Sequence, residues 1–83
     1  MDREMLERRL TLADRRIGQL THHVEQQRNV IAALVAAGRG NSETAHIARD
    51  LLRTMERNLR VETADRKRLR VQLRASGQSF SPG

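Results

Sequence analysis

The sequence contains no cysteine, tryptophan or tyrosine, and its single phenylalanine is Phe80 in the C-terminal tail. Without cysteine the chain has no disulfide, no thiol nucleophile and no thiolate ligand for a metal. Without aromatic bulk, a core must be built from Leu, Ile, Val, Ala and Met, which suits packing between helices better than a closed sheet. Proline, the strongest helix breaker, is absent from residues 1–81. These absences favour an all-α fold.

Long hydrophobic runs are also missing. The longest apolar run covers residues 30–37, whereas a helix needs about 20 apolar residues to cross a bilayer. The first ten residues are highly charged and contain no apolar core of a signal peptide. We therefore expect a cytoplasmic protein with no membrane partner.

The apolar residues that are present recur with the period of a helix. In the first half of the chain they follow alternating steps of four and three residues, with one polar interruption at Gln27. Such a heptad stripe is typical of a helix that faces another helix. Asp2 can cap the start of this helix, and Gly38 can end it. The stepping covers Leu6, Leu10, Ala13, Ile17, Leu20, Val24, Gln27, Ile31 and Leu34.

The second half repeats the pattern after a turn-like segment, Gly-Arg-Gly-Asn-Ser, at residues 38–42. Asn41 or Ser42 can cap the second helix. Its stripe is apolar at both ends and charged in the middle, at Glu62 and Arg66. Pairs four residues apart, Glu4–Arg8, Glu56–Arg60 and Glu62–Arg66, have the orientation that stabilises a helix.

The sequence thus predicts one domain, residues 1–75, folded as an antiparallel helical hairpin. We expect helix 1 at about 2–37, the turn at 38–42, helix 2 at about 43–74, and a disordered tail at 76–83. A short turn places residue n near residue number 83 − n, roughly. The predicted helix–helix seam consists of Leu10, Ile17, Leu20, Val24, Ile31, Leu34, Leu52, Met55, Leu59, Leu69 and Leu73.

A two-helix seam leaves one flank of each apolar side chain in water, so a lone hairpin buries too little to offset the ordering of its chain. We therefore expect a homo-oligomer, with a dimer favoured, that forms a four-helix bundle or an antiparallel coiled coil. The apolar surface widens near the turn, which is either a thicker local core or a contact with another chain. The contact interpretation is favoured, and it names Val30, Val35, Ile47 and Leu51.

Candidate chemistry is sparse. His22, His23 and His46 lack the spacing of metal ligands, and two helices offer no enclosed pocket for catalysis, so we expect no metal, no cofactor and no enzyme. Glu62 and Arg66 occupy positions that face the other helix. Either both extend outward to water or they form a buried ion pair that fixes the alignment. Gly18 either lets the helices approach closely or only weakens its helix.

Basic residues gather at the open end of the hairpin, and the chain carries a net charge of +6. Such a patch can bind phosphates, although acidic residues are interspersed and no aromatic residue is present to stack on bases. A solvated charged surface is the simpler interpretation, and nucleic-acid binding is the alternative. The candidate anion or nucleic-acid patch is Arg8, Arg9, Arg15, Arg16, Arg66, Lys67, Arg68, Arg70 and Arg74.

Three short segments, residues 7–10, 25–28 and 64–69, resemble those of short Arg-rich helical proteins of high-GC soil bacteria. That resemblance covers roughly residues 2–73 and implies no function for the chain. In architecture alone the chain is similar to Rop-type hairpins, which dimerise into a four-helix bundle.

The sequence as a whole predicts a small non-enzymatic interaction protein, a self-associating hairpin that acts as an adaptor or regulator of an unknown protein partner. The alternative is a nucleic-acid-binding regulator that uses the basic open end.

Overall fold

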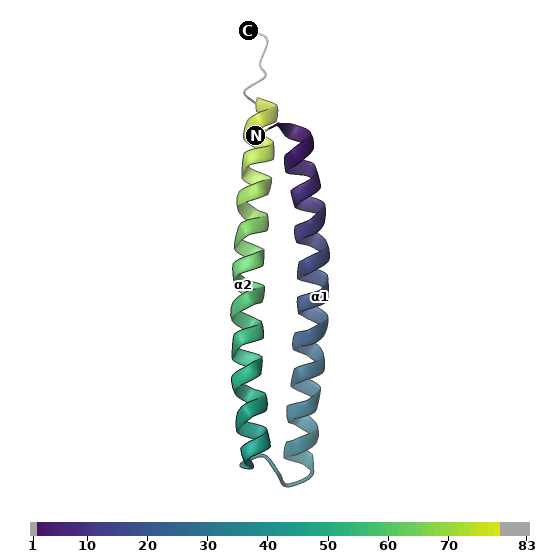
Figure 1. Cartoon of the computed structure of the whole chain (residues 1–83), viewed down its shortest axis with the longest axis vertical. Coiled ribbons are helices and arrows are strands. Elements are labelled where there is room, and N and C mark those ends of the chain that lie inside the picture. The colour runs from purple at the N-terminus through teal and green to yellow at the C-terminus, as the bar shows by residue number, and fades with distance from the viewer. Residues whose placement is uncertain (1, 79–83) are drawn as a thin grey trace.

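The chain forms two long helices that lie side by side and run in opposite directions (Figure 1). The computed structural model describes residues 2–78. Within that range α1 spans Arg3–Ala36 and α2 spans Glu43–Gln78, and no strand occurs among these residues. The two helices pack against each other along their length. The predicted all-α helical hairpin is therefore confirmed.

Both helix starts are capped by short polar side chains. Asp2 has an extended backbone, and its Oδ1 atom accepts a hydrogen bond from the backbone N–H of Met5 at 2.8 Å. At the start of α2, the Oγ atom of Ser42 accepts from the backbone N–H of Ala45 at 3.2 Å. Each cap satisfies one N–H group that has no partner inside its helix.

The turn depends on Gly38, whose φ of 74° lies in the left-handed region. The backbone N–H of Gly38 donates to Val35 at 3.0 Å, and the N–H of Arg39 donates to Leu34 at 2.8 Å. This pair of bonds is a Schellman motif, in which the residue after the helix must reverse the sign of φ. Glycine does so without the steric cost of a Cβ atom. The turn segment therefore ends α1 where the sequence predicts.

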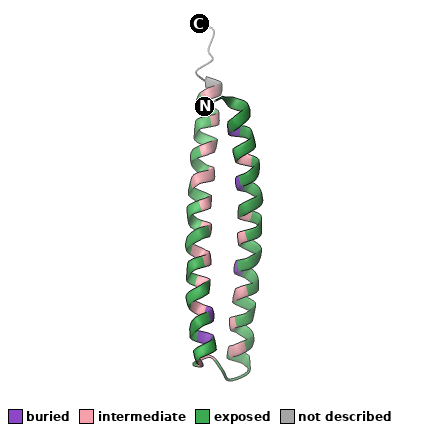
Figure 2. Ribbon diagram, in the orientation of Figure 1, coloured by how far each residue is buried: buried purple, intermediate pink, exposed green. Residues whose placement is uncertain are grey.

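The heptad stripes meet at the seam. The buried and half-buried positions of α1 are 6, 10, 13, 17, 20, 24, 27, 31 and 34, which alternate in steps of four and three. Figure 2 shows the buried positions of both helices on the sides that face each other. All eleven residues predicted for the seam are buried or half-buried. The core is nevertheless thin, because the buried residues are Leu6, Ala13, Val24, Ala45 and Ala48.

The end of α2 differs from the prediction. The sequence ends this helix at residue 74 and begins a disordered tail at 76, whereas the helix continues to Gln78. Ser and Gly each cost a helix about 1 kcal/mol or less, and one additional hydrogen bond per residue lets a long helix extend through them. The rest of the predicted tail, residues 79–83, lies outside the described residues.

Gly18 does not bring the helices together. It is exposed, and a Cβ atom added there would meet nothing within 4 Å. The interpretation that Gly18 permits a close approach is therefore wrong, and its effect is limited to the helix that contains it.

Neither helix crosses a membrane by the usual criteria, since no stretch of the described residues is both long and apolar enough.

We expect Gly18→Ala to raise the free energy of unfolding by about 0.5 to 1 kcal/mol, because alanine costs a helix interior less conformational entropy than glycine. Urea denaturation followed by circular dichroism measures this change. A loss of stability would mean that Gly18 faces a neighbour in the assembled protein.

We expect the same substitution at the turn, Gly38→Ala, to have the opposite sign. A Cβ atom at φ 74° costs roughly 1 kcal/mol or more, so the free energy of unfolding should fall by that amount. Gly18→Ala is the matched control in the same denaturation experiment. Equal stability of the two variants would contradict the strained turn.

Candidate functional site

The charged interruption of the seam is formed by Glu62 and Arg66, which are half-buried at the helix–helix interface. Their side chains are 26% and 25% exposed. A guanidinium nitrogen of Arg66 lies 3.1 Å from Oδ1 of Asp14, and Glu62 lies 4.0 Å from Arg16. Each charged group therefore pairs across the seam with a residue of α1, and both pairs remain accessible to water because Asp14 and Arg16 are 51% and 63% exposed.

Two of the ion pairs predicted within α2 are replaced by pairs between the helices. Glu4 and Arg8 do pair within α1, at 2.7 Å. Glu56, predicted to pair with Arg60, instead binds Arg28 of α1 at 2.9 Å. Glu62 likewise reaches α1, and among residues 2–78 no ion pair joins it to Arg66. The helical spacing of four residues allows both geometries, and the partner helix supplies a closer cation in these cases.

A side-chain hydrogen bond also joins a specific residue of α1 to a specific residue of α2. Nε2 of Gln27 donates a hydrogen bond to the backbone carbonyl of Ala48 at 2.8 Å. Gln27 is the polar residue that interrupts the α1 stripe, so its amide is satisfied inside the seam rather than left without a partner. The cross-helix pairs Asp14–Arg66 and Arg28–Glu56 have residue numbers that add to 80 and 84, close to the alignment that the sequence predicts.

One face of the hairpin, here called the apolar face, carries most of the exposed large hydrophobic residues. Leu12 and Val61 border two shallow hollows that share Arg16 and Glu62, so they lie on the same side. Positions spaced by seven residues share a side of a helix in this heptad geometry. By that spacing Met5 falls on the side of Leu12, and Ile47 on the side of Val61. Val30 and Leu51 lie seven residues from His23 and Asn58, which border the second hollow. The apolar face consists of Met5 (48% exposed), Leu12 (49%), Val30 (48%), Ile47 (61%), Leu51 (47%) and Val61 (55%).

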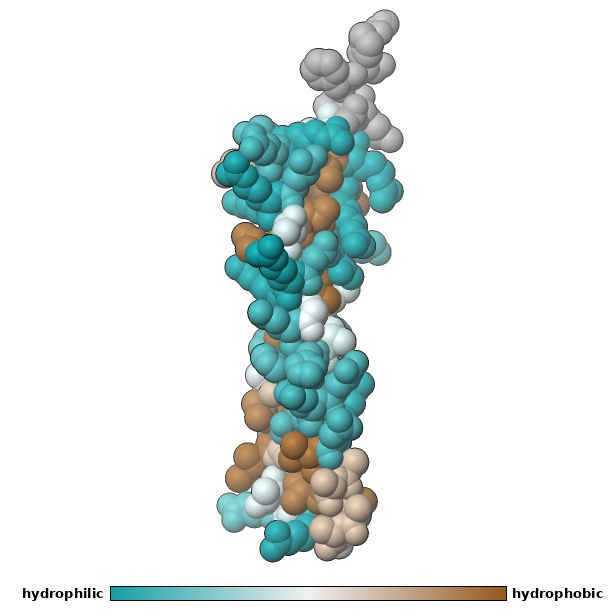
Figure 3. Space-filling model, turned by 90° about the vertical axis from the view of Figure 1, so that its right-hand side faces the viewer, coloured by the Kyte–Doolittle hydropathy of each residue, from teal (hydrophilic) through white to brown (hydrophobic). Residues whose placement is uncertain are grey.

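The predicted contact residues divide between two sides. Val30, Ile47 and Leu51 belong to the apolar face, whereas Val35 lies beside Gly40 and near Arg49, seven residues before Glu56 on the opposite side. Met5, Leu12 and Val61 were not predicted, although extending the heptad spacing from Ile47 would have found Val61. In Figure 3 hydrophobic side chains gather toward the turn end, and the open end is mostly hydrophilic.

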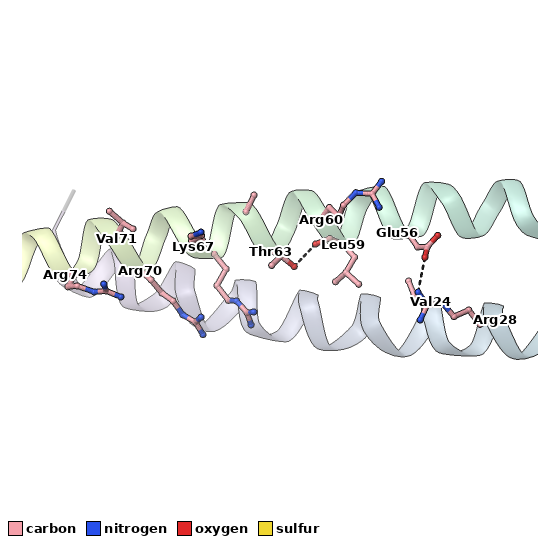
Figure 4. A pocket seen from close by; sticks show the side chains of 12 residues that line it. Val24, Arg28, Glu56, Leu59, Arg60, Thr63, Lys67, Arg70, Val71 and Arg74 are labelled. Atoms are coloured by element: carbon pink, nitrogen blue, oxygen red, sulfur yellow. Dashed lines mark hydrogen bonds and ion pairs between the residues drawn. The ribbon is translucent and has the colours of Figure 1, made fainter.

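The opposite side contains a groove of about 940 Å³ along the open half of the hairpin (Figure 4). Val24 and Arg28 of α1 form one wall, and the other lining residues come from α2. Its apolar lining consists of Val24, Leu59, Ala64 and Val71. Its basic lining consists of Arg28, Arg60, Arg66, Lys67, Arg70 and Arg74, against one acidic residue, Glu56. We call this the basic groove.

The structure divides the predicted basic patch. Arg66, Lys67, Arg70 and Arg74 line the basic groove. Arg9, Arg16 and Arg68 border the hollow on the apolar face, where Glu62 and Asp65 accompany them. Arg8 pairs with Glu4 on the surface of α1, and Arg15 is exposed and lines neither site. The nine residues therefore do not form one continuous anion-binding surface.

Arg28 and Arg60 are basic groove residues that the sequence prediction missed. Arg60, Lys67 and Arg74 are spaced by seven residues, so the heptad register that located the seam also carried the signal for this row of cations. Arg28 belongs to the groove only because the two helices align as they do.

Between residues 2 and 78 no group of three or more His, Cys, Asp or Glu side chains could hold a metal ion. The rings of His22 and His23 are 6.3 Å apart at an angle of 45°, and both residues are exposed.

No protein-family model, curated protein or solved structure matches the chain.

We expect the double substitution Glu62→Leu and Arg66→Leu to raise the free energy of unfolding by roughly 1 to 2 kcal/mol. The attraction within a half-buried ion pair offsets little of the free energy lost when its charges leave water. Leucine at both positions would instead extend the apolar seam. Thermal and urea unfolding measure the effect. Arg57→Leu, at an exposed position of the same helix, serves as control and should change stability by no more than about 0.5 kcal/mol. A loss of stability in the double variant would show that the cross-seam ion pairs outweigh hydrophobic burial.

Proposed function

We propose that the chain is a small non-enzymatic interaction protein whose hairpin associates with a second copy through the apolar face. The observation that carries this proposal is the row of exposed Met, Leu, Ile and Val side chains on that face. Exposed hydrophobic residues that gather on one side of a small protein favour a contact with another molecule. Two hairpins packed on these faces would form a four-helix bundle.

The thin core supports the same conclusion. Between residues 2 and 76, three of the five buried residues are alanines, and no large side chain is less than 2% exposed. Ordering each residue costs about 1–2 kcal/mol, which a seam of half-buried side chains offsets poorly. A second hairpin would cover the outer flank of the seam and supply the missing burial.

The composition of the apolar face suits a symmetric contact. In a two-fold dimer the same surface lies on both sides of the interface and must be complementary to itself. The apolar face satisfies this requirement, since its apolar row is bordered by charges of both signs, Arg16 with Glu62 and Arg68 with Asp65. The charged residues that line the basic groove on the opposite side are six cations and one carboxylate, so this side would repel a copy of itself.

We expect sedimentation equilibrium to show a dimer at micromolar concentration, and the double variant Ile47→Gln, Val61→Gln to raise its dissociation constant at least about tenfold. Each substitution removes a half-exposed side chain that dimerisation would bury, worth on the order of 1 kcal/mol, and it does so in both copies.

The matched control is Val35→Gln with Val71→Gln, which removes side chains of similar exposure, 54% and 55%, from outside the apolar face. Its dimerisation should be nearly unchanged. A folded monomer for the unsubstituted chain would refute self-association. Equal weakening by both double variants would refute the assignment of the contact to the apolar face.

A further inference from the structure

The basic groove has two features that a merely solvated charged surface does not need. Its floor is apolar where Val24 and Leu59 meet in the seam between the helices. Ala64 and Val71 are exposed on α2 and extend the apolar surface along one edge of the groove, with Val71 55% exposed. Its walls carry six basic residues and one acidic residue. Exposed apolar surface and an excess of positive charge are both unfavourable in water. A partner that covers the apolar surface and carries negative charge would remove both costs.

Part of the positive charge is already neutralised within the hairpin. Arg28 binds Glu56 at 2.9 Å, and Asp14 lies 3.1 Å from Arg66 and 4.0 Å from Arg70. The remaining cations, Arg60, Lys67 and Arg74, are exposed, and no ion pair joins them to an acidic residue in the described part of the chain. They recur every seven residues along α2, which spaces them by about 10 Å.

We propose that the basic groove binds an acidic amphipathic helix of a different protein. A helix lying in the depression between α1 and α2 places an apolar stripe on the floor, in the manner of helices that dock into grooves. Acidic residues at every seventh position of that helix then face Arg60, Lys67 and Arg74. This is the arrangement by which flanking charges select partners in coiled coils. The inference deepens the proposed function by giving the chemistry of the partner.

A second copy of this chain does not fit the groove. Asp14 and Glu56 already pair with residues of the groove, and Glu62 and Asp65 lie on the apolar face beside arginines. Acidic residues recur at seven-residue spacing at most twice, as Glu7 with Asp14 and as Glu43 with Asp50, so no acidic row matches the three unpaired cations in number. Glu7, Asp14 and Asp50 are moreover already paired with arginines of the same hairpin. Nucleic acid fits less well, because phosphates gain nothing from the apolar floor and are repelled by the carboxylates of Asp14 and Glu56.

The test uses a fluorescein-labelled peptide of about three heptads, with leucine at positions a and d and glutamate at positions e and g. Its own charges oppose self-association. Fluorescence anisotropy should show binding to the full chain in the micromolar range that weakens as salt rises from about 50 to 500 mM. A peptide with glutamine in place of each glutamate should bind at least about tenfold more weakly.

The groove variant combines Arg60→Ala, Lys67→Ala and Arg74→Ala, and should weaken peptide binding at least about tenfold. The control variant combines Arg8→Ala, Arg15→Ala and Arg39→Ala, which removes the same charge from exposed positions outside the groove. It should change binding less than about threefold. Alanine favours helix, so both variants are expected to fold, and circular dichroism checks this.

Equal losses in the two variants would overturn the proposal, since net charge alone would then account for binding. It would also be overturned if a labelled DNA duplex or RNA stem-loop, and not the acidic peptide, depended on the groove residues. Sedimentation separates this inference from self-association. The groove variant should still dimerise, and the Ile47→Gln, Val61→Gln variant should still bind the peptide.

Discussion

The seam between α1 and α2 determines which residues lie together on each outer side of the hairpin. It buries few residues. Two helices share a single line of contact, so each side chain in it keeps one flank toward water. Among residues 2–76 five positions are buried, and three of them are alanines. The hairpin is therefore held by a long series of modest contacts, and its hydrophobic residues are only partly removed from solvent.

Polar groups give this seam its alignment. An apolar heptad stripe can slide by one repeat with little change in burial, because one leucine replaces another. Gln27 bonded to the Ala48 carbonyl, and the ion pairs of Asp14 with Arg66 and Arg28 with Glu56, join specific residues of the two helices. A slip would separate these ion pairs and would leave the half-buried Gln27 amide without its acceptor, which is costly. The charged interruption of the α2 stripe thus has an identifiable partner on α1.

Once the alignment is fixed, the two long sides of the hairpin acquire different characters. The side of Leu12 and Val61 holds an apolar row with mixed charges along it. The other side holds the basic groove, whose apolar floor is bordered by cations. A surface that carries both signs can meet its own copy, whereas a surface of one sign requires a partner of the opposite sign. The two proposed contacts therefore occupy separate surfaces and do not compete.

The sequence by itself determined the two helices, their caps and the residues that face the seam. Heptad spacing and the positive φ that the turn requires at Gly38 depend on neighbouring residues only, so the sequence is enough to predict them. The tertiary structure decided what lies across the seam from each residue. It paired Glu56 with Arg28 rather than with Arg60, and it divided the arginines of the open end between two sides. It also placed Gly18 in open space rather than in the contact. These outcomes depend on the rotation and alignment of one helix against the other, which no local pattern specifies.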